Sequence, residues 1–185
     1  FVMERVYMNN LEALRLDCII KQKRGVHFII TSVLVWVGIF LVQLSSMPIL
    51  TKNLFTFICT GLVLPVSFAI SKLVKIDFQN KSNPLTNLGL ILSVDQMLYL
   101  LIAMWIYPTI PDKMLMVIAM IFGAHLLPFS WLYKSNIYLI FSILIPFISL
   151  FVGLIYSPVV LAATMILIEL LFCLALTLEN KKEKI

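Results

Sequence analysis

The sequence predicts an all-α integral membrane bundle of six transmembrane helices, preceded by a short N-terminal cytoplasmic or interfacial helix. Three observations support this prediction: the composition, the length of the apolar stretches and the distribution of basic residues. Of the 185 residues, 62% are hydrophobic and 12% are charged, whereas soluble domains are about 45–50% apolar and about 25% charged. A soluble core of this length could not bury so much apolar surface, so the excess is expected to face lipid.

The six apolar stretches each approach the roughly 20 residues that a helix needs to cross a bilayer. They cover residues 26–44, 54–71, 88–107, 114–133, 137–156 and 159–178. Asn83-Pro84 and Ser157-Pro158 are typical of an N-cap followed by a first-turn proline, and Asp112 is the expected N-cap of the fourth helix. The stretches are too long and continuous for the alternating strands of a membrane barrel.

The basic residues predict that both chain ends lie in the cytoplasm. When the segments between spans are assigned alternately to two sides, only Lys52 and Lys113 fall on the outer side. Such an asymmetry favours the basic side as the cytoplasmic one, and it explains the net charge of +5 without a nucleic-acid partner. The twelve inner residues are Arg5, Arg15, Lys21, Lys23, Arg24, Lys72, Lys75, Lys81, Lys134, Lys181, Lys182 and Lys184.

The chain is therefore expected to have three parts: an N-terminal cytoplasmic amphipathic segment (1–25), a six-helix transmembrane domain (26–178) and a charged cytoplasmic tail (179–185). Residues 9–24 predict a short helix capped by Asn9 or Asn10, interpreted as lying on the inner leaflet, with a partner-binding helix as the alternative. Met3, Met8 and a residue further upstream all remain open as the translation start.

Aromatic residues fall near the predicted membrane boundaries, where amphipathic rings prefer to lie. Small residues at Ala119 and Gly123 are spaced by four, which favours a close helix contact. The aromatic residues are Trp105, Tyr107 and Tyr156 at outer ends, and Trp131, Tyr133 and Tyr138 at inner ends.

Three ionisable residues, Asp95, His125 and Glu169, lie within predicted spans. Counted from the inner ends of their spans, all three lie roughly 10–14 Å from the cytoplasmic boundary at 1.5 Å per residue. They are thus candidates for one intramembrane polar cluster, with Gln96 and Tyr99 as polar neighbours. Intramembrane ionisable residues commonly mark ion pathways or proton relays, so the favoured hypothesis is small-solute or ion/proton-coupled transport.

Two alternatives remain open. In the first, the protein is a non-transporting regulatory or structural membrane protein whose polar residues only fix helix packing. In the second, it is a membrane-embedded enzyme, although GxSxG, P-loop, HExxH and GxGxxG motifs are absent. No catalytic residue, cofactor or metal site is predicted, since the three cysteines lack CxxC spacing. Mid-span prolines at 65, 128 and 146 are interpreted as kinks.

Several segments resemble a family of small bacterial multi-pass membrane proteins of unknown function. They are KQKRG (21–25), TKNL (51–54), NPLTNLG (83–89), QMLYLLIAMW (96–105), PDKM (111–114) and FGAHLLPFSWLYKS (122–135). The likeness covers about residues 8–155, so Glu169 lies outside it. The resemblance implies a protein of the bacterial cytoplasmic membrane and brings no activity. The expected partners are the lipid bilayer, a proton, cation or small solute, and, because the bundle is small, a second copy in a homodimer.

Overall fold

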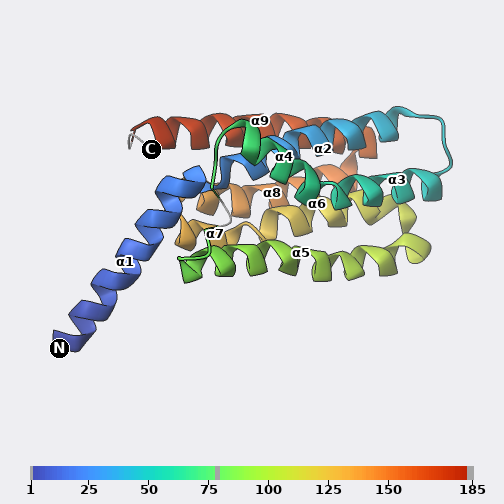
Figure 1. Ribbon diagram of the computed structural model, residues 1–185. Coiled ribbons are helices and arrows are strands. Elements are labelled where there is room, and N and C mark those ends of the chain that lie inside the picture. The colour runs from blue at the N-terminus through green and yellow to red at the C-terminus, as the bar shows by residue number, and fades with distance from the viewer. Residues whose placement is uncertain (1, 78–79, 183–185) are drawn as a thin grey trace.

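The computed structural model describes residues 2–77 and 80–182, with side chains from residue 10 onward, and this part of the chain is helical without a strand. Figure 1 shows a bundle of roughly parallel and antiparallel helices from which the first helix projects. The helices are α1 (Val2–Gln22), α2 (Val26–Leu44), α3 (Ile49–Gly61), α4 (Val63–Leu73), α5 (Pro84–Thr109), α6 (Met114–Ala124), α7 (Leu127–Leu132), α8 (Asn136–Ile155) and α9 (Pro158–Lys182), with single turns η1 (Lys23–Gly25) and η2 (Pro111–Lys113).

Six helices of the described chain are long and apolar enough to cross a membrane, as the sequence predicts. Two of them are interrupted: the second, Ile49–Leu73, consists of α3 and α4, and the fourth, Pro111–Leu132, consists of η2, α6 and α7. The second begins five residues before the predicted Leu54, and the third extends over the whole of α5. Composition therefore locates the spans, whereas their interruptions are a structural finding.

The core lies mainly where α2 packs on α9 and α6 packs on α8. Ile39, Ala119, Ile145 and Phe172 are completely buried there. The predicted close contact at Ala119 and Gly123 is confirmed, because a Cβ added at Gly123 would lie 2.7 Å from the Cβ of Ile145. Small residues at such a contact let two helix backbones approach closely.

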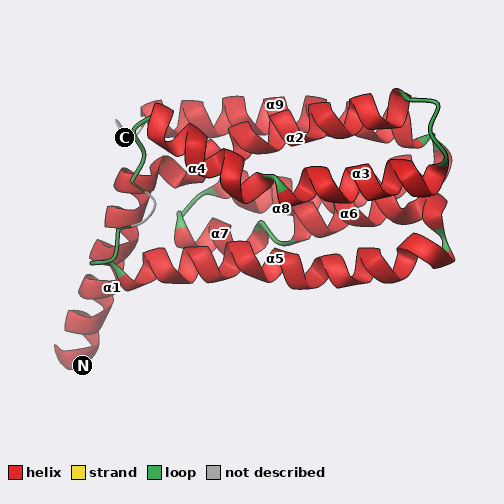
Figure 2. Cartoon of the chain, turned by 45° about the vertical axis from the view of Figure 1, so that its right-hand side comes forward, coloured by secondary structure: helices red, strands yellow, loops and turns green. Residues whose placement is uncertain are grey.

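The chain turns sharply between α1 and α2. Lys23, Arg24 and Gly25 all have positive φ (46°, 51° and 68°), a left-handed conformation that only glycine adopts without cost. As a result α1 leaves the bundle at an angle, at the end where the chain also finishes (Figures 1 and 2). The prediction of an N-cap at Asn9 or Asn10 is wrong, because α1 is already helical from Val2 onward.

Two of the other cap predictions are confirmed and one is wrong. Asn83 accepts a hydrogen bond from the backbone N–H of Leu85 and starts α5, and the Ser157 hydroxyl accepts one from the N–H of Val160 at the start of α9. The prediction for Asp112 is wrong, because it lies within η2 and Lys113 precedes α6 instead. Pro111 starts this extra turn, which moves the beginning of the α-helix past the aspartate.

The aromatic residues at the predicted membrane boundaries differ in exposure. Trp105, Tyr156 and Trp131 are exposed on the bundle surface, as expected for membrane-boundary residues, but Tyr133 and Tyr138 are buried. Their hydroxyls donate to Gln22 Oε1 (2.7 Å) and to the Arg24 carbonyl (2.8 Å), respectively. The two tyrosines therefore hold the turn between α1 and α2 against the bundle.

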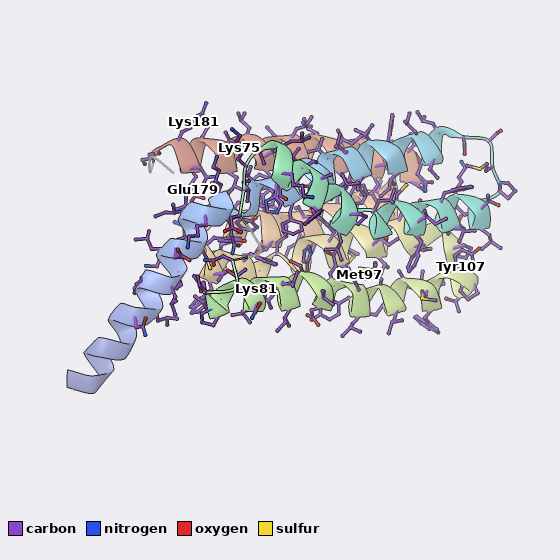
Figure 3. The ribbon with its side chains drawn as sticks, in the orientation of Figure 1. Lys75, Lys81, Met97, Tyr107, Glu179 and Lys181 are labelled. Atoms are coloured by element: carbon purple, nitrogen blue, oxygen red, sulfur yellow. The ribbon has the colours of Figure 1, made fainter. Side chains whose placement is uncertain are left out.

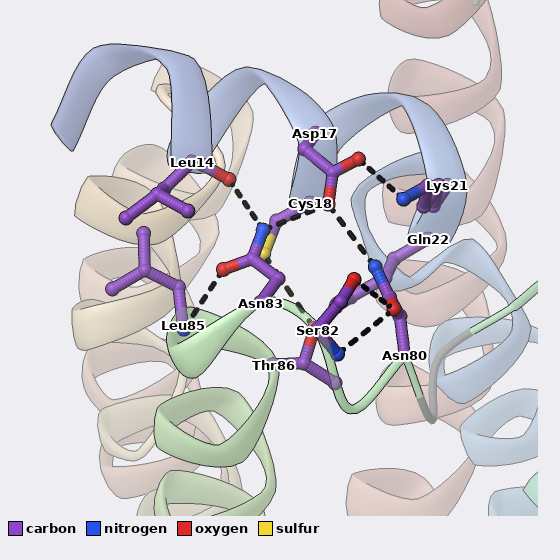
Figure 4. Close-up of polar contacts among 10 residues, drawn as sticks. All are labelled: Leu14, Asp17, Cys18, Lys21, Gln22, Asn80, Ser82, Asn83, Leu85 and Thr86. Carbon is purple, nitrogen blue, oxygen red and sulfur yellow. Dashed lines mark hydrogen bonds and ion pairs between the residues drawn. The ribbon is translucent and has the colours of Figure 1, made fainter. Parts of the chain in front are cut away.

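The loop before α5 fastens α1 to the bundle. Asn83 donates to the Leu14 carbonyl and to the Asp17 carboxylate, both at 2.8 Å, and Gln22 donates to the Thr86 hydroxyl at 3.2 Å. Figure 4 shows these contacts between the two helices. Since Asn83 also caps α5, one side chain sets both the start of α5 and the position of α1.

Candidate functional site

Both interruptions lie just before a proline. Pro65 and Pro128 have no N–H, so they cannot donate to the carbonyls of Gly61 and Ala124 four residues earlier. At these points the N–H groups of Leu62 and Leu126 bond three residues back, to Cys59 and Gly123, which tightens the last turn before each break. In contrast, α5 and α8 contain a proline and continue without interruption.

A cavity of about 50 Å³ lies at the two breaks. Its volume is several times the 10–15 Å³ that one water molecule requires by the same measure, so it has room for only a few waters. Non-helical backbone at membrane depth is tolerated where it is buried in protein or lines a water-filled cavity. The lining includes Thr60 and Val63 at the first break, His125 and Leu126 at the second, Ser93 and Gln96 on α5, and Gly25, Tyr133 and Tyr138 near the turn that follows α1.

His125 is the titratable residue located at a helix break. Its Nδ1 lies 2.5 Å from the Phe122 carbonyl oxygen, and because a carbonyl only accepts, Nδ1 carries the hydrogen in this contact. Nε2 makes no hydrogen bond to the described residues. The imidazole thus has one nitrogen fixed by the backbone and a second with a lone pair that can accept a proton.

The three predicted residues of α5 differ in their relation to this histidine. Gln96 lines the cavity. Asp95 is partly buried and interacts electrostatically with His125, without forming an ion pair within the described chain. Tyr99, one turn further along α5, interacts with Asp95 and is 42% exposed on the outside of the bundle. Hence Asp95 interacts with His125 but does not itself line the cavity.

Glu169 lies elsewhere, on α9 where that helix packs against α2. It is completely buried, does not line the cavity, and interacts with the Ser32 hydroxyl of α2. Tyr138 lies between the two regions, since it lines the cavity and interacts electrostatically with Glu169. The structure therefore brings Asp95, Gln96 and His125 together and places Glu169 in a separate helix contact.

Arg24 has a role that the sequence did not indicate. It was counted only among the charges that set orientation, but its side chain is 1% exposed. It donates to the Tyr133 carbonyl (3.2 Å) and to Asn180 Oδ1 (2.9 Å), and it lies 3.6 Å from a Glu179 oxygen. These contacts link η1 to α9 and to the residue that follows α7. The sequence feature that could have indicated this role is Gly25, which directly follows the basic residues Lys23 and Arg24 and is typical of a turn.

Metal coordination gains no support from the geometry. Among the residues that the structure describes, no three histidine, cysteine or acidic side chains are grouped as ligands. Cys18, Cys59 and Cys173 are free thiols.

The fold and the site together define a class: a multi-pass α-helical membrane protein with a small polar cavity at two interrupted helices. The chain belongs to the family of unknown function DUF7010, whose model matches residues 11–179. This match extends beyond the resemblance seen in the sequence and includes Glu169. Neither the curated proteins nor the solved structures contain a match to this chain.

Proposed function

We propose that the protein is a small transport protein of the bacterial cytoplasmic membrane that conducts protons, or a small cation coupled to them, through the cavity at the helix breaks. The observation that carries the proposal is the position of His125 at an interruption of a spanning helix, on the wall of this cavity. Discontinuous membrane helices form the ion and substrate sites of many transporters.

The size of the cavity favours a proton or small ion over a metabolite. Ligand pockets for drug-sized molecules are roughly 300–1,000 Å³, whereas this cavity measures about 50 Å³. We assign proton transfer to Nε2 of His125. Burial of the ring opposes its charged form, and the interaction with Asp95 favours that form to a smaller extent. Gln96 and Ser93 provide polar groups for the waters that would carry the proton onward.

Reconstitution into liposomes tests this function. Purified protein is incorporated into vesicles that contain a pH-sensitive dye, and a potassium diffusion potential, negative inside, drives proton entry. We expect faster acidification than in protein-free vesicles. Repeating the assay without a proton gradient, with sodium, potassium or ammonium gradients, identifies a coupled cation. Rates equal to those of protein-free vesicles under all these conditions would overturn the proposal.

A non-transporting role is the second candidate, and one observation favours it. The polar group around Arg24 is fully occupied with holding η1, α7 and α9 together, so buried polar residues in this bundle do serve packing. If the liposomes show no flux and Arg24→Leu abolishes folding, the results favour a non-transporting role in which the buried polar residues hold the helices together.

A further inference from the structure

We propose that Glu169 and Ser32 form an intramembrane proton-binding site between α2 and α9, separate from the cavity at the helix breaks. The proposal goes beyond the transport function and does not depend on it. It assigns a ligand, the proton, to a buried carboxyl group that lies outside the cavity.

Two facing polar groups without partners are the main observation. Glu169 is 0% exposed and Ser32 is 2% exposed. Neither oxygen of the Glu169 carboxyl, nor the Ser32 hydroxyl, has a hydrogen-bond partner of normal geometry among the described residues. The two side chains nevertheless interact across the α2–α9 contact. Buried polar groups are usually satisfied, so a facing pair without partners requires an explanation.

The charges around Glu169 do not neutralise a carboxylate. Within the part of the chain that the structure describes, the ionisable groups that interact with it are Tyr138 on α8 and Cys173 on its own helix, and neither is a cation. His27 is buried on α2 five residues before Ser32, and α6 has no ionisable side chain. Arg24, the buried cation of this region, is bound to the Tyr133 carbonyl and to Asn180.

Burial without an opposite charge decides the protonation state. An isolated carboxylate in such a place costs several kcal/mol, and the group neutralises instead. The neutral acid has one O–H, which can donate to a hydroxyl, and Ser32 is the hydroxyl with which Glu169 interacts. The arrangement thus suits a carboxyl group that holds a proton where α2 packs against α9.

The donor set excludes larger cations. Glu169 and Ser32 together offer three oxygen atoms, whereas calcium takes six to eight oxygen ligands and magnesium requires an octahedral set. Among the described residues no further acidic, histidine or cysteine side chain completes a metal site here. A proton needs a single acceptor, so it is the ligand that the geometry accommodates.

Infrared spectroscopy of the full-length protein in liposomes at neutral pH tests the proposal. We expect the difference spectrum between wild type and Glu169→Gln to contain the carbonyl band of one neutral carboxylic acid. The matched control is Glu179→Gln, because Glu179 lies beside Arg24 and accepts a hydrogen bond from Ser135. Its difference spectrum is expected to show the loss of a carboxylate band only.

Ser32→Ala supplies a second readout, since removal of the hydroxyl is expected to shift the frequency of the Glu169 band without removing it. If Glu169→Gln fails to fold, the proposal is tested by the frequency of the Glu169 band in Ser32→Ala alone. A carboxylate band lost in Glu169→Gln, or no effect of Ser32→Ala, would overturn the site. If the acid band is absent but proton flux is normal, the Glu169 site is refuted and the transport function stands. If the acid band is present but the liposomes show no flux, the transport function is refuted and the Glu169 site stands.

Discussion

Gly123 lies where α6 presses against α8, and no other residue fits there. A Cβ at this position would meet the Pro146 ring at 2.5 Å and the Ile145 Cβ at 2.7 Å, closer than atoms in a packed core can approach. Forcing an extra carbon into a packed contact typically costs 1–3 kcal/mol. The close approach of α6 and α8 at this point therefore requires a glycine at position 123.

We expect Gly123→Ala to lower the stability of the protein by about 1–3 kcal/mol, measured as the midpoint of thermal unfolding in detergent. The matched control is Gly61→Ala, because a Cβ at Gly61 would have no atom within 4 Å. An unchanged midpoint for Gly123→Ala, or an equal loss for both variants, would contradict the close α6–α8 contact.

Individual residues show what sequence reasoning reached and what it missed. Asp95 and His125 stand out in the sequence because ionisable groups are rare in apolar stretches, and the structure places them near each other. Their common depth with Glu169 did not determine whether all three meet, because depth along a span leaves the rotation of each helix open. Tyr133 and Tyr138 lie at predicted inner ends of their spans, and their position along the spans gives no sign that they are buried against the turn after α1.

At the scale of elements, the attachment of α1 depends on Asn83. Its side chain caps α5 and also donates to the Leu14 carbonyl and to Asp17 of α1. Replacing an N-cap residue by alanine typically costs about 1 kcal/mol. Here the loss also releases α1, so the effect should concentrate at this junction (Figure 4).

Hydrogen exchange measured by mass spectrometry should therefore show faster exchange in residues 10–22 and in the first turn of α5 for Asn83→Ala than for wild type. Ser82→Ala is the control, because the described contacts of the Ser82 side chain are confined to Asn80 in the same loop. Unchanged exchange in α1 of the Asn83 variant would show that other contacts, such as that of Arg15 with Trp131, hold α1 in place.

The interruptions of the two spanning helices show the limit of element prediction. The predicted spans contain three mid-span prolines, Pro65, Pro128 and Pro146, and each is expected at most to kink its helix. Only Pro65 and Pro128 accompany a break, whereas α8 tolerates Pro146 and α5 tolerates Pro108 near its end. Both breaks follow a glycine by one or two residues, at Gly61 and Gly123. In this chain, a glycine followed by a proline four or five residues later marks the spans in which the helix is interrupted.

At the scale of the whole molecule, basic side chains lie at one end of the helix bundle. Figure 3 shows Lys75, Lys81 and Lys181 at the end of the bundle from which α1 projects, and Tyr107 at the opposite end. The number of spans was predictable because length and hydropathy alone determine it. The pairing of the helices was not, because apolar surfaces facing lipid and apolar surfaces facing protein have the same composition.

We propose that the basic end, with both chain termini, faces the cytoplasm. A fluorescent protein fused after residue 185 is then expected to fold and fluoresce, whereas alkaline phosphatase at the same position is expected to be inactive. Fusions in the segment between α2 and α3 should behave in the opposite way. An active phosphatase at the C-terminal end would reverse the orientation.

The most direct test of the account compares wild type, His125→Ala and Thr164→Ala in the liposome proton assay at one fixed membrane potential. Removing a proton-transfer group typically costs 10²-fold or more in rate, so we expect His125→Ala to slow acidification by about 10²-fold. Thr164→Ala should match wild type, because the Thr164 hydroxyl bonds only to the Val160 carbonyl of its own helix. Equal proton flux in folded wild type and His125→Ala would contradict the assignment of the pathway to the cavity at the broken helices.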